Sequence, residues 1–129
     1  MTKSLKLGVI VGLAKEPEEE IRKVHDLGLP TCQLSAWNPE VYNDETLHSL
    51  MTACQKYGVE VSSLWAGYPG PAVWNFIDGP STIGLVPPQF REMRVEALKK
   101  AADFAEKAGI PSITTHAGFI PENPKDPLY

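Results

Sequence analysis

One pattern occurs three times along the chain. A helical stretch closes on a glycine, and a short apolar stretch then ends on a large aromatic or imidazole side chain. The three copies read VHDLGLPTCQLSAW, CQKYGVEVSSLWAG and AEKAGIPSITTHAG, and their terminal side chains are Trp37, Trp65 and His116. Repeats of this kind build parallel sheets whose ligand sites lie at the carboxyl ends of the strands. We therefore expect an α/β fold made of parallel β/α units.

The length of the chain restricts which β/α fold it can form. A closed barrel of eight units needs roughly 250 residues, and this chain has 129 residues. It is therefore either a complete open-sheet domain or about half a barrel. Near the end, Asp126 and Pro127 form an N-cap followed by a first-turn proline, which predicts a further helix beyond Tyr129. We expect residues 1–129 to be one partial barrel domain, truncated after its fourth strand.

Hydrophobic periodicity places the elements within this domain. We expect strands over residues 5–13, 31–37, 59–65 and 112–117. Helices are expected over residues 17–27, from Asp44 as N-cap to Gly58, and over residues 90–108. In the last helix, Met93 is expected on the apolar face and Arg91 on the polar face.

A long connection, rich in proline and glycine, spans residues 66–89. Connections of this length are uncommon inside compact domains and often form lids or binding loops. Its apolar side chains are unusual for a solvated loop; they are Tyr68, Trp74, Phe76 and Ile77. We expect a lid-like functional loop, and the alternative is a variable surface insertion.

The parity of the strands indicates whether the three terminal side chains converge. Trp37, Trp65 and His116 each lie an odd number of positions after the closing glycine. Because strand side chains alternate between two faces, all three are expected on the same face. We expect mostly small or polar neighbours on that face: Gln33, Ser35, Val61, Ser63, Ser112 and Thr114. Such a face fits a barrel interior beneath a site, although Trp37 and Trp65 fit core tryptophans equally well.

His116 is the strongest single candidate for a functional residue. It ends a strand, and Gly118 follows closely, so that backbone and ligand can approach. An imidazole there can donate to a substrate hydroxyl, ligate a metal or shuttle a proton. The alternative is a histidine bonded to a neighbouring loop. We expect His48 to be solvated and His25 to be structural.

Composition and missing motifs exclude several classes of function. The net charge is −4 with a pI of about 5.3, and no basic stripe favours nucleic-acid binding. No run is long enough to span a membrane. The first strand–helix turn, GLAKEPEEE, lacks a Gly-rich phosphate motif. No cluster of His, Asp and Glu forms a metal site by its spacing. Cys32 and Cys54 indicate reduced core residues of a cytoplasmic protein.

The second part of the chain resembles a known family. Residues 74–129 contain GPSTIGLVP, then Arg91 and Arg94, then THAGFIPE followed by a DP pair. This segment is similar to the first half of bacterial sugar phosphate isomerase/epimerase proteins, which belong to the xylose isomerase-like TIM barrel superfamily. Over residues 1–73 only the repeat pattern agrees.

The resemblance implies that the chain is the N-terminal half, about four β/α units, of a (β/α)₈ barrel. It implies an enzyme that moves a proton through an enediolate, with a divalent metal polarising carbonyl and hydroxyl oxygens. In that family pattern, the metal-binding and acid/base carboxylates come from the second half of the barrel. We therefore expect no catalytic residue and no tightly bound metal in this chain, and an inactive fragment.

The same resemblance lends substrate-binding roles to His116, Trp65 and Trp37, with a small sugar as the partner. Arg91 and Arg94, at the start of the last helix, have three possible roles. They anchor the lid-like loop, meet a substrate phosphate, or have an exposed structural role.

Two other interpretations remain open. An apurinic-site endonuclease of the same superfamily would need several metal-binding histidines and a basic DNA face, and the acidic balance argues against it. A small non-catalytic α/β binding module would not need the helix start at Asp126. In isolation, half a barrel leaves two sheet edges unpaired, so we expect self-association.

Overall fold

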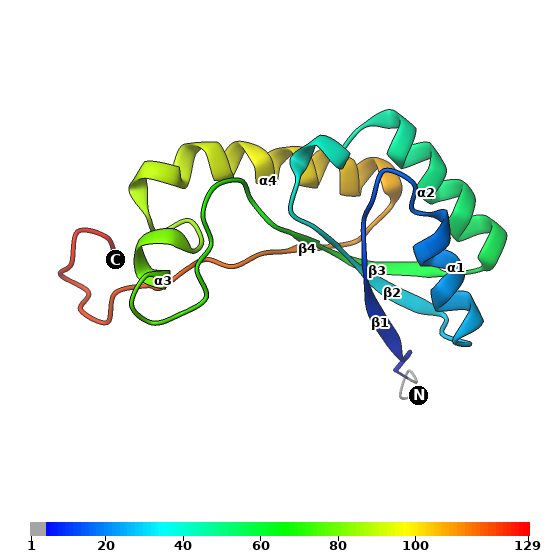
Figure 1. The fold of residues 1–129 in the computed structure, drawn as a ribbon, viewed down its shortest axis with the longest axis horizontal. Coiled ribbons are helices and arrows are strands. Elements are labelled where there is room, and N and C mark those ends of the chain that lie inside the picture. Colours follow the sequence, from blue (N-terminus) through cyan, green and yellow to red (C-terminus); the bar gives the residue numbers. More distant parts are fainter. Residues whose placement is uncertain (1–4) are drawn as a thin grey trace.

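A computed structural model describes residues 5–129 and shows a parallel four-stranded sheet with the order β1-β2-β3-β4 (Figure 1). The strands are β1 (Gly8–Gly12), β2 (Thr31–Ala36), β3 (Glu60–Ala66) and β4 (Ile113–Thr114). The helices are α1 (Glu18–Asp26), η1 (Pro39–Val41), α2 (Asp44–Tyr57), α3 (Gly79–Thr82) and α4 (Pro88–Ala108). The repeating β/α order confirms the predicted fold class.

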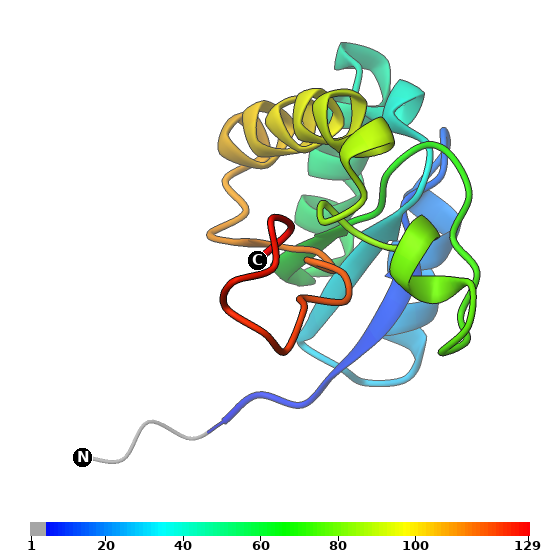
Figure 2. The same cartoon turned by 90° about the vertical axis from the view of Figure 1, so that its left-hand side faces the viewer.

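The long helices α1, α2 and α4 pack against one face of the sheet (Figures 1 and 2). Each helix contributes small or branched apolar residues to a continuous core with the strands. The central members of this core are Ile21, Val24, Leu34, Leu50, Leu64, Ala101 and Phe104. Burying such side chains is the main stabilising contribution to this layer. Within residues 5–129, no helix combines the length and the apolar character needed to cross a bilayer.

The opposite face of the sheet is uncovered and largely polar. Gln33 donates a hydrogen bond from Nε2 to the Thr114 Oγ1 at 3.2 Å, so these two residues share this face, as expected. Ile10 of β1 is 64% exposed there. Strands β1 and β4 form the two edges of the sheet. Self-association through these edges stays a prediction.

Several expected element boundaries are wrong by one or more residues; helix α4, for example, begins at Pro88 rather than at residue 90. Pairing of β1 begins at Gly8 because its partner strand begins only at Thr31, after Pro30. Strand β4 pairs with β3 at only two positions, so it is much shorter than residues 112–117. Asp44 is the first residue of α2 rather than its cap. The cap is Asn43, whose side chain accepts a 2.9 Å hydrogen bond from the Thr46 amide.

An irregularity in β3 corrects the prediction for Val61. The register pairs Cys32 with Val61 but Gln33 with Ser63, so Ser62 is an extra residue in β3. An extra residue of this kind reverses the alternation of side chains on one strand. Val61 therefore packs against the helix-covered core and not on the face of Trp65.

The apolar face of α4 also differs from the prediction at one position. Met93 is 45% exposed, whereas its neighbour Arg94 is completely buried. A buried arginine is uncommon because the guanidinium must be hydrogen-bonded to offset its desolvation. Periodicity alone places a charged residue in solvent. Here the hydrogen-bond partners of the Arg94 guanidinium are carbonyl oxygens of the connection between β3 and α4.

Candidate functional site

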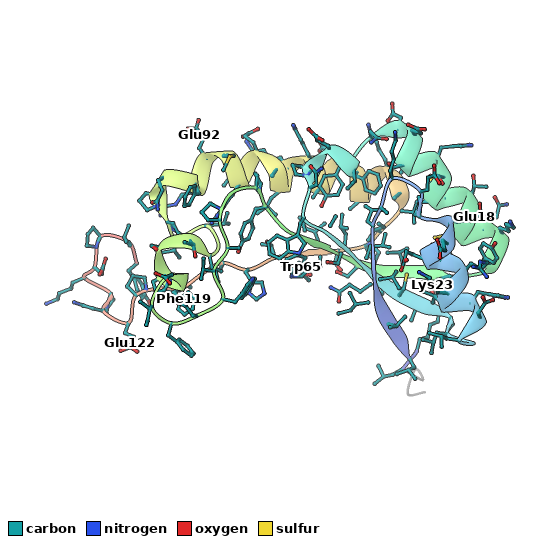
Figure 3. All side chains as sticks on the ribbon, viewed as in Figure 1. Glu18, Lys23, Trp65, Glu92, Phe119 and Glu122 are labelled. Carbon is teal, nitrogen blue, oxygen red and sulfur yellow. The ribbon has the colours of Figure 1, made fainter. Side chains whose placement is uncertain are left out.

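The three strand-end side chains meet at the carboxyl ends of the sheet, as their parity predicts. The Trp37 and Trp65 ring centroids are 4.6 Å apart, and those of Trp65 and His116 are 5.9 Å apart. Both pairs are edge-to-face, a favourable arrangement for aromatic rings. Figure 3 marks Trp65 between the sheet and the segment that carries α3. The site therefore begins as a row of rings across β2, β3 and β4.

A fourth ring joins this row from the long connection. Trp74 lies 4.7 Å from His116 and 6.3 Å from Trp37, measured between ring centroids. We call Trp37, Trp65, Trp74 and His116 the aromatic wall. The sequence marked Trp74 as unusually apolar for a loop but gave no reason to place it beside His116, because that contact joins two separate segments.

Part of the wall depends on a glycine. A Cβ atom at Gly67 would lie 2.7 Å from Cε3 and 2.8 Å from Cδ2 of Trp37. These distances are shorter than real carbon contacts, so the Trp37 ring can occupy this position only over a residue without a side chain. Gly67 directly follows β3, and its amide donates to the Ala36 carbonyl at 2.7 Å.

The connection between β3 and α4 (residues 67–87) is clamped to α4 by Arg94. Its guanidinium donates to the carbonyl oxygens of Gly84 at 2.6 Å, Pro71 at 2.7 Å and Pro69 at 3.2 Å. It also lies over the Tyr68 ring, 4.3 Å from the centroid. Burial lowers the pKa of Arg94 from its ordinary value, and the attraction to Tyr68 opposes that shift. Of the three roles left open for Arg94, the structure shows attachment of the connection, and its burial is inconsistent with an exposed role.

Arg91 makes a similar but exposed attachment. Its Nε donates to the Leu85 carbonyl and its Nη2 to the Val86 carbonyl, both at 2.7 Å. The side chain is thus already bonded to the connection, like that of Arg94.

The far end of the connection is joined to the segment after β4. Gly84 and Gly118 form an isolated antiparallel bridge, and the Leu85 amide donates to the Ala117 carbonyl at 2.7 Å. At Gly84, φ is +79°, and an added Cβ would lie 2.2 Å from the Ala117 oxygen. The Gly84 amide also donates to the buried Tyr68 hydroxyl at 2.8 Å. The connection is therefore bonded both to α4 and to the segment after β4.

A hollow of about 360 Å³ opens beside the wall. It is lined by Trp74, Asn75, Phe76, Ile83, His116, Gly118 and Phe119. Phe119 lies beside α3, where a Cβ at Gly79 would approach its ring to 2.7 Å. Figure 3 labels Phe119 next to helix α3. We call this cavity the wall hollow.

A larger hollow, of about 570 Å³, lies at the opposite end of the sheet. Its lining includes Lys6, Ile10, Gln33 and Glu60, from the amino ends of the strands. Ligand sites of parallel sheets lie at the carboxyl ends, where loops can vary without disturbing the strands. The wall hollow is therefore the better candidate site despite its smaller volume.

The described residues do not fit a divalent metal. Within residues 5–129, no three His, Cys, Asp or Glu side chains gather as a ligand set. His25 is bonded through Nδ1 to the Tyr57 carbonyl at 2.9 Å, and His48 is exposed on α2, as expected. Burial raises the pKa of both the Cys32 and the Cys54 thiol to about 11, which disfavours the thiolate that binds metals.

The wall and the hollow suit a neutral, partly apolar ligand. The face of an aromatic ring carries partial negative charge and attracts the C–H face of a sugar ring. His116 is exposed at the rim and has two ring nitrogens able to donate or accept a hydrogen bond. This combination of apolar surface with few polar groups is typical of small-molecule sites.

Comparisons with known proteins agree with this geometry. A xylose isomerase domain protein from Planctomyces limnophilus superposes with a TM-score of 0.83 and 28% sequence identity over 100% of this chain. Endonuclease IV from Thermus thermophilus superposes over 87% of the chain with a TM-score of 0.61 and 16% identity, which shows the fold alone. The chain spans 46% and 40% of the length of these two proteins.

Two other comparisons gave no match. No family model matches the sequence, and no curated protein is similar to it.

Proposed function

We propose that the aromatic wall binds the sugar substrate of an isomerase or epimerase. The premise is the fold of the chain, which is that of the N-terminal half of a xylose isomerase-like TIM barrel. The observation that carries this proposal is the convergence of Trp37, Trp65, Trp74 and His116 at the carboxyl ends of the strands. The 28% identity to a xylose isomerase domain protein supports it.

Each side chain of the wall has a role in this proposal. The tryptophans bind the C–H face of the sugar and exclude water from it. His116 donates or accepts a hydrogen bond at one sugar oxygen and fixes the orientation of the ring. These are binding and orienting roles, so we assign no catalytic residue to this chain.

Proton transfer between adjacent carbons requires an acid/base group, and the proposed enzymes also use a divalent metal. Residues 5–129 hold no ligand cluster for such a metal. In the proposal, both functions belong to other residues of a complete barrel, and the chain by itself is inactive and binds metal weakly. Titration calorimetry with Mn²⁺, Mg²⁺, Zn²⁺ and Co²⁺ checks this; one tight stoichiometric site would contradict it.

An endonuclease activity is the less favoured alternative. The similarity to endonuclease IV is at 16% identity, and the net charge of this chain is −4. A DNA-binding face attracts phosphates through clustered Lys and Arg. Two arginines of α4, Arg91 and Arg94, are instead bonded to carbonyl oxygens of the connection.

Sugar binding can be measured through the three tryptophan indole N–H signals in ¹H–¹⁵N spectra. Adding D-xylose, D-fructose or D-glucose should shift these signals. Removing the imidazole in His116→Ala should weaken binding of the responding sugar about 5- to 150-fold, which corresponds to a lost bond of about 1–3 kcal/mol. The control is His48→Ala, because His48 is exposed on α2. Unchanged indole signals with every sugar, or equal losses in both variants, would contradict the proposal.

A further inference from the structure

The wall hollow offers a ligand very few hydrogen-bonding partners. Four of its seven lining residues are apolar or aromatic side chains: Trp74, Phe76, Ile83 and Phe119. Gly118 adds only backbone. The two remaining residues, Asn75 and His116, carry polar side chains, Trp74 adds one indole N–H donor, and no carboxylate, Lys or Arg lines the hollow.

The amide of Asn75 is already engaged by its own loop. Its Oδ1 accepts hydrogen bonds from the amides of Ile77 at 2.8 Å and Asp78 at 2.6 Å. Its Nδ2 donates to the Asp78 carboxylate at 3.1 Å. The imidazole of His116 and the indole N–H of Trp74 are therefore the main polar groups that the lining offers to a ligand.

A bare sugar fits this lining poorly. Among the lining side chains, only the imidazole of His116 and the indole N–H of Trp74 offer a hydrogen bond to a sugar hydroxyl, so most hydroxyl groups would face apolar side chains. A phosphate fits even less, because Arg91 and Arg94 are bonded to carbonyl oxygens of the connection. The hollow therefore matches the non-sugar part of a ligand.

We infer that the wall hollow binds a neutral apolar substituent, an aryl or alkyl group, carried by the sugar that the aromatic wall binds. This inference rests on the proposed function and names its substrate class: a sugar bearing an apolar group, rather than a free or phosphorylated sugar. His116 lies at the junction, because it belongs to both the wall and the hollow lining.

The size and rigidity of the hollow support this assignment. A volume of about 360 Å³ is enough for one aromatic ring with its linker. The turn at Asn75 and the close approach of Gly79 to the Phe119 ring hold two parts of its lining in place. A preformed apolar site loses little entropy when a rigid aryl group enters it.

Two adjacent residues provide a matched pair of variants. Phe76 and Ile77 are 91% and 88% exposed, so truncating either one should leave the fold intact. Only Phe76 lines the hollow, where its ring lies 6.1 Å from that of Phe119. Thermal melts of Phe76→Ala and Ile77→Ala should match that of the unmodified chain.

The test compares matched ligands by titration calorimetry: the 4-nitrophenyl and methyl β-D-glucopyranosides, and the same pair of β-D-xylopyranosides. These are binding probes, because their anomeric ether removes the free carbonyl. We expect the aryl member of at least one pair to bind at least about tenfold more tightly than the methyl member, a factor that reflects burial of one aromatic group. Phe76→Ala should remove most of this difference, and Ile77→Ala should keep it.

Three results would overturn the inference: no aryl member binds more tightly, Phe76→Ala changes nothing, or Ile77→Ala loses as much as Phe76→Ala. Failure of the proposed function is distinguishable. If free sugars shift the indole signals but aryl groups give no advantage, only the inference fails. If 4-nitrophenol alone binds as tightly as its glycosides, the hollow takes aryl groups but the wall binds no sugar.

Discussion

The helix-covered layer of this molecule and its rim are held together by different physical means. The rim consists of the connection (residues 67–87) and the segment after β4 that carries His116 and Gly118. In the layer, apolar side chains such as Ile21, Leu34 and Leu64 are fully buried between the helices and the sheet. At the rim, the connection is held by hydrogen bonds from Arg94 and by a bridge between Gly84 and Gly118. Burial is non-directional, whereas hydrogen bonds and close backbone contacts fix positions. The rim therefore has the kind of contacts that hold a binding site in place.

The largest effect is expected at the clamp. Arg94→Met keeps a long apolar stem but leaves three carbonyl oxygens without a donor. The bond to Gly84 is buried and its loss costs about 1–3 kcal/mol, while the bonds to Pro69 and Pro71 are partly buried and cost less each. We expect the free energy of unfolding to fall by about 3–5 kcal/mol, because the connection can relax and recover part of the loss. Thermal and urea melts measure this change.

Arg91→Met is the matched control for the clamp. Arg91 also bonds two carbonyl oxygens, but it is exposed, so water can replace it. Its loss should cost less than about 1 kcal/mol. Equal destabilisation by the two variants would show that the burial of Arg94 is not what secures the rim.

A smaller effect is expected where the layer meets the rim. Gly67→Ala places a methyl group against the Trp37 ring and should cost about 1–3 kcal/mol by overpacking. The indole signal of Trp37 should move, because its ring has to tilt away. Gly12→Ala is the control, since nothing lies within 4 Å of a Cβ at Gly12. A Trp37 signal that stays in place in Gly67→Ala would mean that the ring is not seated over this glycine.

The layer could be predicted from the sequence because its physics is local. Helix faces follow a 3.6-residue period and the helices end on glycines such as Gly58, whose φ is +65°. The alternation of strand side chains between the two faces of the sheet predicted that Trp37, Trp65 and His116 converge. Whether they bind a sugar stays a prediction.

The rim could not be predicted in the same way. The contacts of Arg94 reach carbonyl oxygens 10 to 25 residues away in the sequence, and backbone carbonyls leave no sequence pattern. The extra residue at Ser62 reversed the expected position of Val61, since one residue changes strand parity. Trp74 was recognised as apolar, but its contact with His116 depends on the path of the whole connection.

The smallest effect is expected within the layer, at a helix end. Asn43→Ala removes the side chain that accepts from the Thr46 amide, a capping loss of about 1 kcal/mol. Asp44→Ala should cost less, because Asp44 follows the cap and contributes through the helix dipole. A larger loss for Asp44→Ala than for Asn43→Ala would restore Asp44 as the cap. Melting temperatures of both variants decide this.

The central claim is that the rim is a preformed part of the site and not a mobile lid. Amide hydrogen exchange tests it most directly at Gly84 and Leu85, whose N–H groups donate to the Tyr68 hydroxyl and the Ala117 carbonyl. The internal reference is the Leu64 amide, which is bonded to the Ser112 carbonyl within the sheet. We predict that both rim amides exchange at least about a thousandfold more slowly than in an unstructured peptide, as in stable secondary structure. Exchange of Gly84 and Leu85 at unstructured rates, while Leu64 stays protected, would contradict the account.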